Sequence, residues 1–231
     1  MAWAPLSKSW CRSPSICDRV TAEPTRRARI LCIDDHPVVR DGISFIVNRH
    51  PDLEVVGCAG TGEEAIRLFR ELRPDITLMD LQLPRVSGLE AIRAIRRDDP
   101  EARVIVLTMY RGDEDIYRAL EAGAKAYLLK DTLSDHLVNV IRDVWAGKTP
   151  TDLYVQERLA ERAEHAQLTS RELEVLELIA KAMRTKEIAA ALGISEETAR
   201  VHIKNILAKC DVSDRIAAVN IARSRGWIHI R

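Results

Sequence analysis

The strongest constraint on the fold is an alternation of short apolar runs with helical patterns, which occurs five times between Arg29 and Trp145. Buried parallel strands read as near-continuous apolar runs, and the helices between them cover both faces of the sheet. We therefore expect an α/β domain with a five-stranded, doubly wound parallel sheet. Its strands are expected at residues 29–33, 53–59, 76–79, 104–107 and 126–129.

Polar side chains stand where four of these runs end. They are Asp34 and Asp35 after the first run, Asp80 after the third, Thr108 after the fourth and Lys130 after the fifth. In an open parallel sheet, ligands bind beyond the carboxyl ends of the strands, so we expect these groups to meet.

These residue types suit phosphoryl chemistry. Three carboxylates repel one another unless a hard cation such as Mg²⁺ lies among them. A hydroxyl and an ammonium group can stabilise phosphoryl oxygens. Each residue alone is also typical of a helix cap or a turn. Their combination and chain order favour a phosphoryl-accepting site.

A second pattern, typical of a helix-turn-helix, begins near Leu168. Thr169 and Glu172 have the spacing of a capping box. Thr185 is expected to cap a short helix that ends at Gly193, and Ser195 is expected to cap the helix that follows. Residues 29–145 hold 16 Lys or Arg against 21 Asp or Glu, a net charge of −5, whereas residues 164–231 hold 11 against 9. A mildly basic second domain is compatible with nucleic-acid binding.

The expected organisation is a disordered tail at 1–27, the α/β domain at 28–147, a linker at 148–167 and an all-α domain at 168–231. The linker is expected to hold a short helix near 154–163. The tail has no apolar core of the kind a signal peptide needs, and no apolar run approaches the ~20 residues of a membrane helix. Cys32 and Cys58 lie in strand runs and are expected to be buried thiols, which suits a reducing compartment. We expect a cytoplasmic protein with no membrane partner.

Four stretches resemble the receiver domain of two-component response regulators, a flavodoxin-like fold: DDHP at 34–37, MDLQLP at 79–84, LTMY at 107–110 and GAKAYLLK at 123–130. The resemblance implies that Asp80 is the phosphoacceptor for a sensor histidine kinase, with Thr108 and Lys130 on the phosphoryl group. It implies Mg²⁺ on Asp35, Asp80 and the main-chain carbonyl of Gln82, with Asp34 acting through water. Thr108 and Tyr127 match the family's switch pair.

Residues 168–176, 186–189 and 194–209 resemble the LuxR-type helix-turn-helix. Together the two domains resemble the NarL/FixJ class, which implies binding to double-stranded promoter DNA and a homodimer when phosphorylated. In this class the unmodified receiver often covers the recognition helix, here residues 196–209. Base contacts are implied for Arg200, Val201 and Lys204, and phosphate contacts for Lys186, Thr198, His202 and Lys209.

The chain departs from the helix-turn-helix pattern at several positions. The family usually has Gly where Ala182 stands, and Leu-Gly where Cys210-Asp211 stand. It usually has Val at Ala199 and Ser-Asn at Arg184-Thr185, which puts a contact from Thr185 in doubt. None of the other changes removes a proposed contact.

Two alternative functions were weighed. Enzymes of the haloacid-dehalogenase type also use a strand-end Asp, but they need a second acid two residues later, where this chain has Gln82. We therefore expect no enzyme. A phosphorylation-independent DNA-binding regulator with a vestigial receiver is the other alternative. The complete set of Asp35, Asp80, Thr108 and Lys130 argues against it.

Overall fold

The computed structural model describes residues 26–132 and 135–229, so most of the expected tail, residues 1–25, lies outside the described part. The α/β domain has a parallel sheet in the order β2-β1-β3-β4-β5. Its strands are β1 (Ala28–Ile33), β2 (Leu53–Ala59), β3 (Ile76–Met79), β4 (Val104–Thr108) and β5 (Ala126–Leu129). The predicted doubly wound sheet is confirmed.

Both faces of the sheet are covered, which explains why its strands are apolar throughout. Alternate β1 residues face opposite cores, with Leu31 on one side and Cys32 on the other. The first core is covered by α2 (Gly62–Leu72), α3 (Gly88–Asp98) and α4 (Asp113–Glu121), and the second by α1 (Pro37–Asn48) and α5 (Asp135–Trp145). A short 3₁₀ helix, η1 (Lys130–Thr132), follows β5.

The strand order brings the acidic residues together. After β1 the chain forms β2 on one side and β3 on the other, so the strand order reverses beside β1, where ligands bind in such folds. Ile33 pairs with Met79, and the Asp80 amide donates to the Ile33 carbonyl at 2.9 Å. The residues that follow these strands are therefore neighbours.

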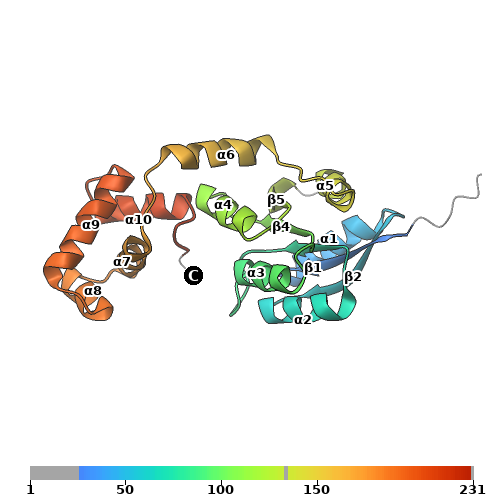
Figure 1. Cartoon of the computed structure of the whole chain (residues 1–231), viewed down its shortest axis with the longest axis horizontal. Helices are drawn as coiled ribbons and strands as arrows, with labels where there is room; N and C mark the ends of the chain where they lie inside the picture. The colour runs from blue at the N-terminus through green and yellow to red at the C-terminus, as the bar shows by residue number, and fades with distance from the viewer. Residues whose placement is uncertain (1–25, 133–134, 230–231) are drawn as a thin grey trace, which may run out of the picture.

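The linker helix, α6 (Leu153–Glu164), lies along α4 (Figure 1). Its Val155 is buried in the α/β core. Arg162 pairs with Glu114 at 2.8 Å and lies over the Tyr117 ring, 3.5 Å from its centroid. The predicted short helix is confirmed, and it packs as part of the α/β domain.

The helical domain has a core of its own, formed by α7 (Ser170–Ala180), α8 (Thr185–Leu192), α9 (Glu196–Cys210) and α10 (Arg215–Ser224). The capping box at Thr169, the cap at Ser195 and the left-handed Gly193 (φ 64°) are confirmed. The predicted cap at Thr185 is wrong, because Arg184 occupies that position. The Thr185 hydroxyl instead accepts from Arg215 Nη2 at 2.8 Å.

Candidate phosphoryl site and nucleic-acid interface

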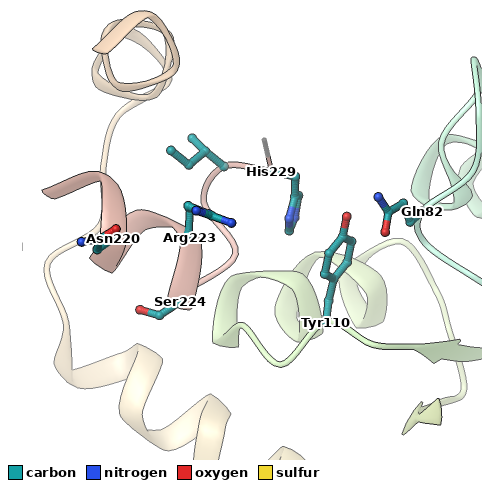
Figure 2. A pocket seen from close by; sticks show the side chains of 7 residues that line it. Gln82, Tyr110, Asn220, Arg223, Ser224 and His229 are labelled. Atoms are coloured by element: carbon teal, nitrogen blue, oxygen red, sulfur yellow. The ribbon is translucent and has the colours of Figure 1, made fainter. Parts of the chain in front are cut away.

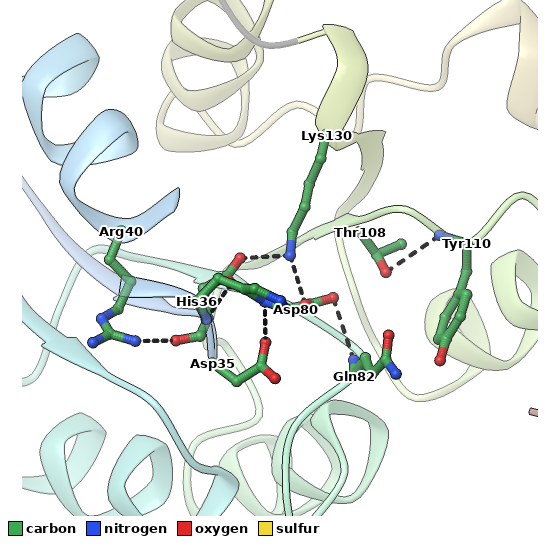
Figure 3. Close-up of polar contacts among 9 residues, drawn as sticks. Asp35, His36, Arg40, Asp80, Gln82, Thr108, Tyr110 and Lys130 are labelled. Atoms are coloured by element: carbon green, nitrogen blue, oxygen red, sulfur yellow. Dashed lines mark hydrogen bonds and ion pairs between the residues drawn. The ribbon is translucent and has the colours of Figure 1, made fainter. Parts of the chain in front are cut away.

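Asp80 lies at the centre of the polar cluster and is 3% exposed. Lys130 Nζ lies 2.6 Å from Asp80 Oδ2, and the Gln82 amide donates to Asp80 Oδ1 at 3.2 Å. Burial raises the pKa of Asp80, and the hydrogen bond from Lys130 acts in the opposite direction. Figure 3 shows Lys130 and Gln82 reaching Asp80 from different elements. The carboxylate is thus held in one orientation by a cation and a backbone donor.

Asp34 and Asp35 lie beside Asp80 at the end of β1. Asp34 is buried and shares the Lys130 ammonium group, with Nζ 2.6 Å from Asp34 Oδ2. Arg40 Nη1 donates to the Asp34 carbonyl at 2.6 Å, which fixes the turn into α1. Asp35 is exposed, and its Oδ1 lies 2.6 Å from His36 Nδ1. The His36 contact was not predicted from the sequence.

Lys130 balances two buried carboxylates. Burial tends to lower the pKa of Lys130, but its hydrogen bonds to Asp34 and Asp80 outweigh that effect and hold its pKa above the usual value. The side chain is therefore a fixed positive charge, as a partner for phosphoryl oxygens must be.

The donor set fits a hard cation. Asp34, Asp35 and His36 offer ligand atoms within 4.8 Å of one another, and carboxylate oxygens are the ligands that Mg²⁺ prefers. Within the described part of the chain, His36 therefore joins the two aspartates in this group. Asp80 still borders this group, because Lys130 bridges Asp34 and Asp80.

Gly88 is required by the close approach of α3 to Asp80. A Cβ at this position would overlap the Asp80 carbonyl, and the Gly88 amide donates to the Leu81 carbonyl at 3.0 Å. This lack of space gives a steric reason for a glycine at position 88.

The predicted switch residues are linked through Tyr110. Thr108, 1% exposed at the end of β4, accepts from the Tyr110 amide at 3.4 Å. The buried Tyr127 hydroxyl donates to the Tyr110 carbonyl at 2.9 Å. Thr108 and Tyr127 thus both contact the backbone of Tyr110.

The recognition helix, α9, carries the predicted base-reading residues on an exposed face. Arg200, Val201 and Lys204 are all exposed, whereas Ala199 and Ile203 face the core. Arg200 pairs with Glu196 at 2.8 Å and Glu197 at 3.7 Å. Such exposed pairs are weak, so they leave Arg200 available to DNA.

The predicted phosphate contacts have different surroundings. Lys186 and Thr198 are exposed, and His202 is partly exposed. Lys209, however, points into the protein, where its Nζ lies 2.7 Å from Glu172 Oε2 and 3.0 Å from the Gln167 carbonyl. In this conformation its ammonium group neutralises a buried carboxylate, and a contact of Lys209 with a DNA phosphate stays a prediction.

Comparisons with known proteins agree with this geometry. The response regulator receiver domain matches residues 30–142, and the luxR family of bacterial regulatory proteins matches residues 166–222. The transcriptional regulatory protein YhcZ of Bacillus subtilis is 42% identical over 203 residues, which is 84% of this chain and 94% of YhcZ. The chain is a response regulator.

Other relatives place this response regulator among DNA-binding members. The response regulator VraR of Staphylococcus aureus is 40% identical over 196 residues, covering 83% of this chain and 94% of VraR. RcsB of Salmonella enterica serovar Typhimurium, solved bound to promoter P1flhDC with phosphomimetic BeF₃⁻, is 27% identical with a TM-score of 0.66. It covers 86% of this chain and 99% of RcsB. The response regulator is thus a transcription factor of a non-enzymatic class.

Within the described residues 26–132 and 135–229, no helix has the length and apolar character needed to cross a membrane.

In this response regulator the two domains touch through residues 225–229, here named the docking segment. The Glu114 amide donates to the Arg225 carbonyl at 3.0 Å. The His229 and Tyr110 rings stack with centroids 4.0 Å apart, and His229 Nε2 lies 2.8 Å from Asp115 Oδ1. Burial raises the pKa of Asp115, and the His229 hydrogen bond opposes that shift.

The docking segment needs a glycine at its bend. Gly226 has φ 75°, and a Cβ there would overlap the Asp115 carboxylate. Beside it is a cavity of about 530 Å³ that reaches from the loop after Asp80 to α10 and that Ile228 also lines. Gln82 and Tyr110 lie on one side of it, and Asn220, Arg223, Ser224 and His229 on the other (Figure 2). The helical domain, here called the effector domain, therefore contacts Tyr110 in the loop after Thr108.

The expected covering of the recognition helix is not what this conformation shows. The contacts to the receiver come from the docking segment, while the base-reading residues of α9 stay exposed. In the same conformation α6 runs along α4, and the end of α10 lies near α4 (Figure 1).

Proposed function

We propose that this response regulator accepts a phosphoryl group on Asp80 from a sensor histidine kinase, and that phosphorylation controls its binding to promoter DNA. The observation that carries the proposal is the Asp80 carboxylate, which is buried at the carboxyl end of the strands and lies 2.6 Å from Lys130 Nζ. The unphosphorylated pocket already has the cation and hydroxyl that a phosphoryl group needs, so positioning and charge stabilisation can do most of the catalysis.

We propose that Asp35 and Asp80, with the Gln82 main-chain carbonyl, hold a Mg²⁺ ion, and that Asp34 acts through water. When bound, the ion would neutralise charge on phosphoryl oxygens. Lys130 would bind one phosphoryl oxygen, and the Thr108 hydroxyl would donate to another. Because Lys130 already contacts Asp34, it can keep one carboxylate partner while it turns toward the phosphoryl group.

The connection to DNA binding runs through Tyr110. When the Thr108 hydroxyl turns toward a phosphoryl group, the Tyr110 amide loses its 3.4 Å partner. The Tyr110 ring stacks on His229, so this movement would weaken the docking segment. The released effector domain could then pair with a second copy, because one recognition helix contacts too little DNA for a tight specific site. We therefore propose a homodimer on two half-sites.

The decisive experiment is incubation with acetyl phosphate and Mg²⁺, followed by intact mass measurement. The wild-type chain should gain the mass of one phosphoryl group, and Asp80→Asn should gain none. Asp35→Ala should suppress the gain because the proposed metal ligand is lost. Asp41→Asn, an exposed acid on α1, is the matched control and should behave like wild type. A wild-type chain that stays unmodified would favour the vestigial-receiver alternative.

A further inference from the structure

Two cysteines lie directly opposite each other on neighbouring strands. Cys32 on β1 is in register with Cys58 on β2. Cys32 is fully buried, but Cys58 is exposed, which corrects the expectation that both thiols are buried. The reason is that β2 is the edge strand of the sheet, so one side of it lies open.

The spacing of these strands is compatible with a disulfide. Paired residues on neighbouring strands lie roughly 4.8 Å apart, and disulfides join Cα atoms about 4.4–6.8 Å apart. Both side chains lie toward α1, since Cys32 belongs to the core that α1 covers and Cys58 Sγ lies 3.7 Å from Ser44 Oγ on α1. The register between β1 and β2 also shifts at Ile30/Leu31. An edge strand with such an irregularity can move the small distance that bond closure requires.

The surroundings give the two thiols different reactivities. The hydrogen bond from Cys32 lowers the pKa of Cys58 to about 6, aided by Ser44 and by the charge of Arg40 and opposed by burial and Asp41. Cys32, in contrast, is fully buried behind it. Cys58 is therefore the accessible and more acidic thiol of the pair, and it is expected to react first.

We propose that Cys58 and Cys32 form a peroxide-sensitive pair that closes into a disulfide between β1 and β2 and slows phosphoryl transfer to Asp80. The thiolate of Cys58 attacks a peroxide oxygen, the O–O bond breaks, and hydroxide leaves to become water by taking a solvent proton. The resulting sulfenic acid is attacked by the Cys32 sulfur. The S–S bond forms, the S–O bond breaks, and the Cys32 proton leaves with the hydroxyl as a second water.

The effect on phosphorylation rests on the function proposed above. Cys32 lies two residues before Asp34, whose amide donates to the carbonyl of Ala59, the residue after Cys58, at 3.1 Å. Closing the disulfide pulls Cys58 away from Ser44 and removes the negative charge near Arg40, the residue that holds the Asp34 carbonyl. A displacement of about 1 Å in such a site can lower a rate by up to about 100-fold.

The test uses the full chain with Cys11→Ser and Cys17→Ser, so that the remaining cysteines all lie in the described residues. After hydrogen peroxide treatment, the intact mass should fall by two hydrogen atoms, and non-reducing peptide mapping should join the Cys32 and Cys58 peptides. Cys58→Ser and Cys32→Ala should each prevent the mass loss, and Cys32→Ala should instead leave a sulfenic acid that dimedone labels. Cys210→Ser, which removes a buried thiol in the other domain, is the matched control and should still lose two hydrogens.

If the peptide map of the Cys11→Ser, Cys17→Ser protein lacks the Cys32–Cys58 link after peroxide treatment, the proposal is overturned, whatever the further variants do. The phosphoryl gain from acetyl phosphate is then compared between oxidised, reduced and re-reduced protein. The oxidised form should react about 10-fold to about 100-fold more slowly and recover on reduction. Equal rates would overturn the regulatory half of the proposal. A reduced protein that takes no phosphoryl group at all would instead refute the function of Asp80, while the mapped disulfide would still stand.

Discussion

Lys209 lies on the recognition helix, but its ammonium group contacts the Glu172 carboxylate on α7. That carboxylate is 4% exposed and also accepts from the Thr169 amide at 2.7 Å. Burial opposes the ionisation of Glu172, yet Lys209 and Thr169 outweigh it and lower the pKa of Glu172 below its ordinary value. The pair therefore joins α7 to α9 with a charge that depends on pH.

We expect Lys209→Ala to lower the free energy of unfolding by about 1–3 kcal/mol, because it leaves a buried acceptor without its cation. Because folding lowers the pKa of Glu172, its ionised carboxylate stabilises the fold at pH values above 4.5, the ordinary pKa of the group. This stabilisation is lost as the pH falls through the lower pKa of the folded state. The difference from wild type should thus shrink in acid. Urea unfolding across pH measures it, with the exposed Lys204→Ala as control. Equal stabilities of both variants near neutral pH would contradict the pairing.

Arg200, in contrast to Lys209, pairs with exposed carboxylates, those of Glu196 and Glu197. We expect Arg200→Ala to cost about 1–3 kcal/mol on a cognate duplex and to relax preference at one base pair. Lys186→Ala is the comparison, because a phosphate contact should weaken binding to every sequence and lower the salt slope by about one. Titrations against cognate and scrambled duplexes at several salt concentrations separate the two. Equal losses on both duplexes would mean that Arg200 touches only the DNA backbone.

The polar residues of the candidate phosphoryl site could be predicted because each follows a strand, and strands are visible in local sequence. Asp34, Asp80 and Lys130 needed only the parallel order of the strands to meet. The role of Lys209 could not be predicted, because its partner lies 37 residues away and is reached only through the packing of α7 on α9. The exposure of Cys58 depended on which strand forms the edge of the sheet.

Among the elements, the end of α7 has an unusual backbone. Ala182 has φ 59° and Asp211, at the end of α9, has φ 54°. Both stand where the resemblance leads one to expect Gly, and the structure explains that preference, because a side chain is disfavoured in the left-handed region. The departure seen in the sequence thus places strain at two helix ends of the effector domain.

We expect Ala182→Gly to raise the free energy of unfolding of the effector domain by about 0.5–1 kcal/mol. Glycine removes the steric strain of a left-handed backbone, and this gain exceeds the cost of the extra conformational entropy that glycine gives the unfolded chain. Ala190→Gly, at an exposed position inside α8, is the matched control and should lower it by about 1 kcal/mol. Thermal unfolding followed by circular dichroism gives both values. A destabilised Ala182→Gly variant would show that the backbone carries no strain there.

At the scale of the whole molecule, the docking segment joins the effector domain to the receiver. No local pattern predicts this contact, because Tyr110, Asp115 and His229 are brought together by the packing of two domains. The helix expected at residues 154–163 was visible in sequence, whereas its packing against α4 was not.

We expect His229→Ala to weaken docking by about 0.5–1.5 kcal/mol, the contribution typical of a stacked aromatic pair. The unphosphorylated variant should become more extended in small-angle X-ray scattering and bind promoter DNA more tightly than wild type. His165→Ala, an exposed histidine after α6, is the control. If both variants keep the wild-type dimensions, the docking segment does not hold the domains together.

The packing of α6 on α4 also has a consequence for protein engineering. Glu114, with 8% of its surface exposed, takes its cations from Arg118 on its own helix and Arg162 on α6. A receiver cut after Gly147 would lose Arg162 and uncover the apolar surface around Val155. When receivers are exchanged between regulators to build new sensors, the junction should therefore lie after Glu164, so that α6 is transferred together with the receiver it packs against.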